Sequence, residues 1–221
     1  MRRIDVISDV ICPWCWIGRA HMERALEELA AEGLRFSVRW RPFQLNPDMP
    51  AAGVERTAYR VAKFGSLERS RELDAGVAEA GRAAGLEFRF ERMLRTPNTL
   101  AAHRVIRMAG AADDARPGLQ DAVAAALFRG YFHDGADLGV ASVLDALAAD
   151  AGLAGAGAML AGDAHRSEVE AEAAAAREGG ISGVPSFLMD RHLLFSGAMP
   201  AARMAQAFRE ADAILAARAP A

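Results

Sequence analysis

The sequence predicts a mixed α/β fold with strands near both ends of the chain and a large α-helical block between them. Three observations support this prediction. The first 41 residues follow a strand–helix–strand pattern, the middle of the chain carries only helical patterns, and strand patterns return after residue 179. A single α/β domain built from both ends of the chain, with a helical domain inserted, accounts for all three.

The opening strand–helix–strand unit is well marked. Residues 3–10 are rich in Ile and Val, as expected for a strand. Pro13 suits the first turn of a helix that runs to Ala31, and Gly33 suits its C-terminal end. Residues 34–41 then alternate between apolar and polar side chains, which predicts a half-buried strand. Such a unit closes right-handed into a parallel strand pair.

The helical block begins after the proline-rich loop 42–50 and ends at about residue 178. Its predicted helices cover residues 56–64, 68–84, 98–109, 119–132, 140–151 and 157–178. Two short strands at 187–189 and 193–195 follow as a hairpin, and a last helix carries Met204 and Phe208 on one face. We therefore predict a discontinuous domain of residues 1–45 and 179–221, and an insertion domain of residues 46–178.

Composition excludes several classes of protein. The chain has 221 residues, with 26 basic and 29 acidic side chains and a net charge of −3, so it offers no electrostatic footprint for nucleic acid or an anionic membrane. The first apolar stretch is too short and too broken by Asp5 and Asp9 for a signal peptide, and no window resembles a membrane span. We expect a cytoplasmic protein.

The only two cysteines, Cys12 and Cys15, are separated by Pro13 and Trp14 at the start of the first helix. Three residues span 300° of a helix, so both thiols lie on one face, within reach of a disulfide. The helix N-terminus favours an anion at Cys12, whereas Cys15 lies one turn deeper. We predict that Cys12 attacks a disulfide and that Cys15 resolves the mixed disulfide.

A structural disulfide and a zinc site are the alternatives to a redox role for the cysteine pair. A stabilising disulfide across so short a loop removes little chain entropy, and thiols in the cytoplasm are mostly reduced. A zinc site needs two more ligands, but the nearest histidine, His21, lies on the opposite side of the helix. We expect no metal.

Val184 and Pro185 follow a glycine-rich approach and precede the first strand of the hairpin. A proline at a strand start leaves neighbouring backbone groups free for a ligand, and X–Pro bonds are the common site of cis peptides. Taken alone, however, this pattern is more typical of an ordinary trans proline.

Together, these features resemble the thioredoxin fold of the DsbA family, in the branch that groups FrnE-type oxidoreductases with 2-hydroxychromene-2-carboxylate isomerases. The stretches that carry the resemblance are residues 8–15 (SDVICPWC), 41–47 (RPFQLNP), 97–104 (PNTLAAHR), 131–132 (YF) and 183–187 (GVPSF). The resemblance implies a thioredoxin-like α/β fold with a large inserted α-helical domain. The chain lacks the second cysteine pair of some FrnE-type relatives.

The resemblance also implies roles for individual residues. Pro185 is expected to be cis and to lie beside the cysteines, and the Val184 backbone to bind substrate as an added strand does. Pro13 and Trp14 complete the substrate-binding surface, and Trp14 tunes Cys12. Periplasmic members carry histidine at the Trp14 position, so their strongly oxidising potential is not expected here. Asn98 is expected to line a glutathione site, or simply to cap a helix.

We therefore expect a protein disulfide oxidoreductase of the DsbA family that acts on thiols or disulfides of proteins or small molecules. Its only redox group would be the Cys12–Cys15 disulfide. A glutathione-dependent isomerase or transferase is the first alternative, although that branch has serine at the Cys12 position. A chaperone-like peptide binder without catalysis is the second. Glutathione as a co-substrate and a homodimer are left open.

Simpler roles are expected for several other residues. Asp9 is expected to cap the first helix, with modulation of proton transfer at Cys12 as the alternative. Trp16 and Trp40 are expected in the core, and His103 and His133 to be hydrogen-bonded or exposed rather than catalytic.

Overall fold

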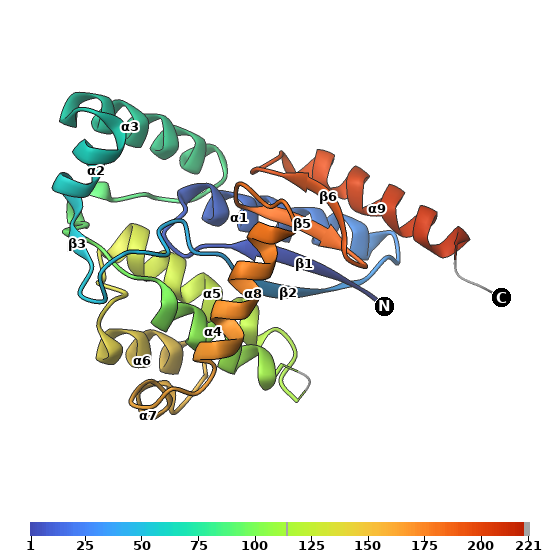
Figure 1. Ribbon diagram of the computed structural model, residues 1–221. Helices are drawn as coiled ribbons and strands as arrows, with labels where there is room; N and C mark the ends of the chain where they lie inside the picture. The colour runs from blue at the N-terminus through green and yellow to red at the C-terminus, as the bar shows by residue number, and fades with distance from the viewer. Residues whose placement is uncertain (114, 219–221) are drawn as a thin grey trace.

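The computed structural model describes residues 1–113 and 115–218 and centres on a four-stranded sheet (Figure 1). The strand order is β2-β1-β5-β6. Strand β1 pairs parallel with β2 and antiparallel with β5, and β5 pairs antiparallel with β6. The strands are β1 (Arg2–Ser8), β2 (Phe36–Pro42), β5 (Ser186–Met189) and β6 (His192–Ser196). The sheet thus joins the two ends of the chain, as the sequence predicts.

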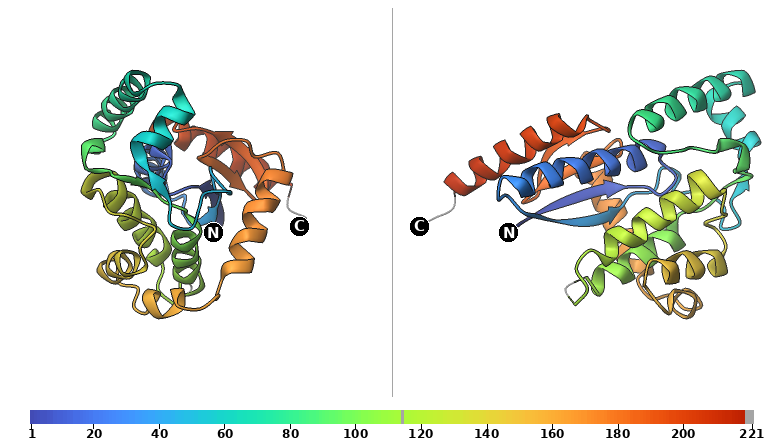
Figure 2. Two further views of the ribbon diagram at one scale, coloured as in Figure 1. Left: turned by 60° about the vertical axis from the view of Figure 1, so that its left-hand side comes forward. Right: turned by 180° about the vertical axis from the view of Figure 1, so that it is seen from behind.

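Helices cover both faces of this sheet. Helix α1 (Pro13–Ala31) and helix α9 (Ala201–Ala217) lie side by side on one face, as two views show (Figures 1 and 2). Helices α4 (Leu100–Ala111), α5 (Leu119–Arg129) and α8 (Arg166–Glu178) contact β2 from the other side. The central strand β1 is therefore buried on both faces, with Ile4 and Val6 fully buried and Ile7 only 3% exposed, whereas the edge strand β6 keeps exposed residues.

The free edge of β2 is closed by a side chain. The Gln120 amide accepts from the Trp40 backbone N–H at 2.9 Å and donates to the Trp40 carbonyl at 3.1 Å. Gln120 therefore replaces the hydrogen bonds that a neighbouring strand would make, and it fixes α5 against the sheet.

The rest of the insertion extends beyond the end of the sheet at which α1 begins. Helices α2 and α3 pack against each other there, and a two-stranded ribbon of β3 and β4 lies at their base (Figures 1 and 2). The sequence patterns did not predict this ribbon, because each strand has only two residues. The bounds are β3 (Val54–Glu55), α2 (Arg56–Phe64), α3 (Leu67–Ala83), a 3-10 turn (Phe90–Arg92), β4 (Arg95–Thr96), a π-helical turn (Gly130–Asp134), α6 (Ala141–Asp150) and α7 (Ala156–Leu160).

The single helix predicted for residues 157–178 is wrong. It is two helices, α7 and α8, with a break in which His165 adopts a φ of 63°. Buried Arg104 stabilises the break, because its guanidinium donates to the backbone carbonyls of Met159, Gly162 and Ala164. A distant side chain thus satisfies carbonyls that a continuous helix would use itself, which a local pattern cannot reveal.

Candidate active site

The two cysteines lie where β1 leads into α1. Cys12 is the N-cap residue of α1 and Pro13 is its first helical residue. The Cys12 N–H donates to the Asp9 carbonyl, and the Cys15 N–H donates to the Cys12 carbonyl, both at 3.0 Å. The first turn of α1 is thus held tightly against the end of β1, with Cys12 at the N-terminus of the helix.

The two thiols have different surroundings. Both are free, they lie 3.5 Å apart, and Cys15 is fully buried whereas Cys12 keeps 5% of its surface exposed. Burial raises the pKa of the Cys15 thiol well above its usual value, and the hydrogen bond with Cys12 raises it further. Cys15 is therefore a protonated, buried thiol directly behind Cys12.

The segment from the other end of the chain lies against Cys12. The Cys12 thiol donates to the carbonyl oxygen of Val184, with an Sγ–O distance of 3.4 Å. The Val184–Pro185 peptide bond is cis. Cys12 and Val184, from sequence motifs near opposite ends of the chain, are thus in direct contact.

Gly18 makes this approach sterically feasible, although no sequence motif marks it. A Cβ atom at residue 18 would lie 3.0 Å from Cγ of Pro185 and 3.6 Å from the Phe187 ring. A side chain there would force Pro185 away from α1. The signal was present in the sequence, since Gly18 is an unexplained glycine within the first predicted helix.

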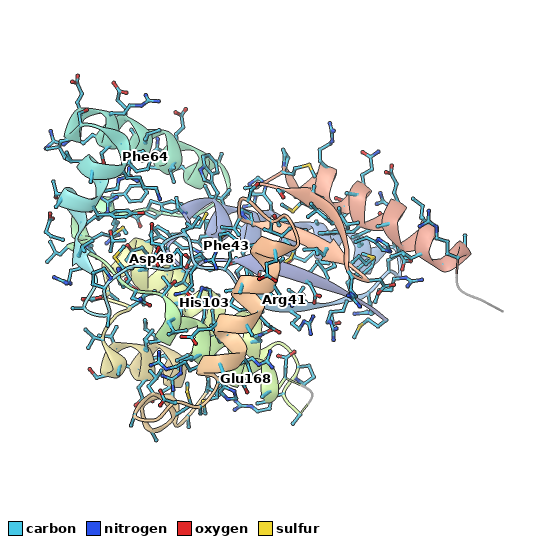
Figure 3. All side chains as sticks on the ribbon, in the orientation of Figure 1. Arg41, Phe43, Asp48, Phe64, His103 and Glu168 are labelled. Atoms are coloured by element: carbon cyan, nitrogen blue, oxygen red, sulfur yellow. The ribbon has the colours of Figure 1, made fainter. Side chains whose placement is uncertain are left out.

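A buried polar cluster supports the site from below. The Asp9 carboxylate accepts from the Leu45 N–H at 2.7 Å, and His103 Nε2 lies 3.3 Å from the other Asp9 oxygen and 3.0 Å from the Phe43 carbonyl. Asp9 has no exposed surface, and Figure 3 shows His103 beside Phe43. The predicted capping role of the Asp9 side chain is wrong, because no side chain caps α1. Asp9 instead fixes the loop after β2.

Cys12 lines a cavity of about 580 Å³ between the sheet and the insertion, which we call the cysteine cavity. Its sheet-side wall is formed by Ile11, Cys12, Pro13, Trp14, Leu45, Gly183 and Val184. Its helical wall is formed by Arg56, Tyr59, Arg60, Lys63, Phe64, Glu72, Leu73, Asp74, Gly76 and Val77. The remaining lining residues, Phe90, Met93, Thr96, Tyr131 and Phe132, are contributed by the segments between these walls. The cavity is large enough for a small molecule.

Aromatic side chains hold the insertion to the cysteine helix. The Trp16 ring stacks on Phe132 with centroids 5.9 Å apart and meets Phe88 edge-on at 4.8 Å. The π-helical turn presents Tyr131 and Phe132 to the cavity, and such turns are frequent at functional sites. Burial raises the pKa of the Tyr131 hydroxyl, which therefore stays protonated at neutral pH.

Comparison with known proteins identifies the family. The model of the DSBA-like thioredoxin domain matches residues 3–209. The chain belongs to this family. A probable DsbA oxidoreductase from Streptomyces coelicolor has a solved structure that is 30% identical and superposes with a TM-score of 0.86, covering 100% of this chain and 93% of that one.

Two more distant structures share the fold of this DsbA-like protein. The cytosolic disulfide reductase DsbM from Pseudomonas aeruginosa, solved with GSH, is 20% identical with a TM-score of 0.62, over 95% of this chain and 98% of that one. A 2-hydroxychromene-2-carboxylate isomerase is 12% identical with a TM-score of 0.66, over 99% and 100% of the two chains. The predicted resemblance and the thioredoxin-like fold class are thus confirmed.

The predicted site residues of the DsbA-like protein fall into two groups. Pro13, Trp14 and Val184 line the cysteine cavity with Cys12, and Trp14 is 44% exposed at its rim. Cys15 and Pro185 are not among the lining residues, and neither is Asn98. Its amide donates to the Met49 carbonyl at 2.7 Å and accepts from the Leu100 N–H at 2.9 Å, so it shapes the entry to α4.

Metal-binding clusters and membrane-spanning helices are both absent from residues 1–113 and 115–218. No three His, Cys, Asp or Glu side chains converge there into a group that could hold a metal ion. No helix in these ranges combines the length and apolar character needed to cross a bilayer.

Proposed function

We propose that this protein is a thiol–disulfide oxidoreductase in which Cys12 is the nucleophile and Cys15 the resolving thiol. The observation that carries the proposal is the asymmetry of the two thiols. Cys12 borders the cavity at a helix N-terminus, whereas buried Cys15 lies 3.5 Å behind it. This is the arrangement that sequential attack and resolution require.

The exchange proceeds in two balanced steps. The Cys12 thiolate attacks one sulfur of the substrate disulfide, which forms a mixed disulfide and releases the first substrate thiolate. Cys15 then loses its proton to solvent and attacks the Cys12 sulfur, which forms the Cys12–Cys15 disulfide and releases the second thiolate. The substrate gains two electrons and the protein loses two. The reverse sequence oxidises a dithiol substrate.

Val184 supplies a backbone site for the bound substrate. Its carbonyl accepts from the Cys12 thiol in the free protein. A mixed disulfide at Cys12 has no S–H to donate, so this carbonyl becomes available to a substrate N–H. Backbone pairing of this kind recognises a chain without regard to its side chains.

A glutathione-dependent isomerase is the second candidate function. The large cavity and its aromatic lining, which includes Phe64, Phe90 and Phe132, favour it because they suit a small aromatic substrate. Two cysteines at the site support exchange instead, since isomerisation needs no resolving thiol. Glutathione as co-substrate and a homodimer stay predictions from the family resemblance, and a cytoplasmic location stays a prediction from the sequence.

The test is a trapping experiment with a small disulfide. We expect Cys15→Ser to stop at a stable mixed disulfide on Cys12, visible by mass, and Cys12→Ser to form no adduct at Cys15. Glutathione-dependent turnover of an aromatic substrate that survives Cys15→Ser would favour the isomerase. Unchanged peptide binding by the double variant, without exchange by the wild type, would favour the chaperone-like alternative.

A further inference from the structure

One face of helix α2 points toward the cysteine cavity. Arg56, Tyr59, Arg60 and Lys63 all line it, at the spacing of three and four residues that places side chains on one side of a helix. These polar residues line the same cavity as Cys12. Their hydrogen bonds determine which of the three cations is free to bind a ligand.

The two arginines are already engaged. Arg56 and Arg60 both donate to the carboxylate of Asp74, at 2.8 Å and 2.6 Å, and Arg60 also donates to the hydroxyl and carbonyl of Ser70. They clamp α2 to α3. The other acid that lines the cavity, Glu72, pairs with Arg69 at 2.8 Å.

Lys63 is different. Its ammonium donates to the Tyr59 hydroxyl at 2.7 Å and lies 5.2 Å from the Tyr59 ring centroid. No described carboxylate forms an ion pair with it. The Tyr59 hydroxyl in turn donates to Asn46 at 2.8 Å, so it holds the ammonium as an acceptor only. An ammonium has three donors, and two of those on Lys63 are left for a ligand.

Lys63 is also the only lysine among 26 basic residues. Arginine suits fixed, bidentate pairs of the kind made with Asp74, whereas lysine is a compact charge on a flexible stem that can follow a ligand. Phe64, which Figure 3 labels on the α2–α3 pair, lies next to Lys63 and adds apolar surface to the same wall.

We propose that the cysteine cavity selects small disulfides that carry a carboxylate, with Lys63 as the residue that binds the carboxylate. The aromatic lining accepts the apolar part of the ligand, and Cys12 attacks its sulfur. The proposal rests on the proposed function, because it assigns a substrate class to the same site. The reaction is the two-step exchange above, which consumes the protein dithiol and releases two substrate thiolates.

The experiment compares two aromatic disulfides as oxidants of the reduced protein. Dithiobis(nitrobenzoate) carries carboxylates and dithiodipyridine carries none, and both release a coloured thiol. We measure the ratio of the rate constant with dithiobis(nitrobenzoate) to the rate constant with dithiodipyridine. We expect Lys63→Met to lower this ratio about fivefold to tenfold, because a charge-assisted hydrogen bond is lost. Lys63→Arg should keep the ratio within about twofold, since it keeps the charge.

Arg71→Met is the matched control. Arg71 is an exposed cation on the neighbouring helix α3 that does not line the cavity, so the ratio should not change. A ratio that Lys63→Met leaves unchanged, or that Arg71→Met lowers equally, would overturn the proposal. Failure of the proposed function looks different: the wild type would stop at a mixed disulfide and release one thiol equivalent instead of two.

A second readout does not depend on exchange. Because Lys63 is the only lysine, its acylation can be followed by peptide mapping, apart from the N-terminal amine. Nitrobenzoate at half-saturation should halve the acylation rate of Lys63 in Cys12→Ser, and neutral nitrobenzamide should leave it unchanged. Equal effects of the two compounds would contradict carboxylate recognition.

Discussion

The two walls of the cysteine cavity differ in the kinds of chemical group that they present. The sheet-side wall presents the Cys12 thiol, backbone groups and apolar side chains, and it rests on buried Asp9 and His103. The helical wall presents charged side chains of α2 and α3, of which Lys63 and Glu72 are exposed. Its ion pairs join α2 to α3, not to the sheet.

This difference indicates that the sheet-side wall serves disulfide exchange and the helical wall serves substrate selection. Exchange needs sulfur atoms held at fixed distances, and buried contacts provide that rigidity. Selection among substrates needs charge that can be changed without loss of the fold, which an exposed helix provides. Substitutions among the buried contacts behind the sheet-side wall should therefore affect stability and exchange together, and those on the helical wall should affect selectivity.

The largest expected effect on stability is at Asp9. Asp9→Ala leaves the Leu45 N–H without a buried acceptor and His103 with only the Phe43 carbonyl, so we expect a loss of about 2–4 kcal/mol in the free energy of unfolding. Urea unfolding measures it. Asp163→Ala is the control, because that carboxylate is 84% exposed in its pair with Arg166 and should lose nothing measurable. Equal losses would contradict the proposed support of the site.

The next effect is at Gly18. Gly18→Val places methyl groups where Pro185 now lies, so we expect a loss of about 1–3 kcal/mol and a lower rate of exchange. Gly76→Val is a useful comparison, because a Cβ at Gly76 meets nothing within 4 Å although the residue lines the helical wall. If both variants exchange disulfides at the same rate, contact between α1 and Pro185 is not needed for the chemistry.

Alkaline pH tests the burial of Cys15. Its pKa is raised in the folded protein, so above about pH 8.5 the unfolded chain loses a proton that the folded protein keeps. The reduced protein should therefore lose stability as pH rises, by at most about 1.4 kcal/mol per pH unit from this thiol. Cys15→Ala should flatten the slope between pH 8.5 and the raised pKa. An equal slope in both proteins would contradict a raised pKa of the buried Cys15 thiol.

Trp14 should show the smallest effect on stability. It is 44% exposed, so Trp14→Ala should change the free energy of unfolding by no more than about 0.5 kcal/mol. It also lines the cavity beside Cys12, so the rate with an aromatic disulfide should fall by about twofold to fivefold. Stopped-flow measurement of thiol release checks this. A large loss of stability would place Trp14 in the core instead.

Much of the fold could be predicted because its patterns are local. Alternation in residues 34–41 and the helical spacing after Pro13 both reflect burial of one face, which the sequence records directly. The break between α7 and α8 could not be predicted in this way. It depends on Arg104, which lies more than fifty residues earlier in the chain and satisfies carbonyls there.

The same was true of the candidate site: local features could be predicted from the sequence, and contacts between distant segments could not. Cys12 and Cys15 were evident from their spacing, and Val184 and Pro185 from the resemblance to a known family. The contacts of Asp9 with Leu45 and His103 depend on how three distant segments pack, so local patterns suggested a capping role instead. The importance of Lys63 also appears only when the hydrogen bonds of its neighbours are known.

The central claim is that Cys12 and Cys15 form a working redox pair. Equilibration of the wild type in thiol–disulfide buffers of graded potential, with thiols trapped and counted by mass, tests it most directly. We predict a single reversible two-electron transition that is absent in Cys12→Ser and in Cys15→Ser. A wild-type protein whose two thiols stay free across the whole range, or are oxidised independently of each other, would contradict the account.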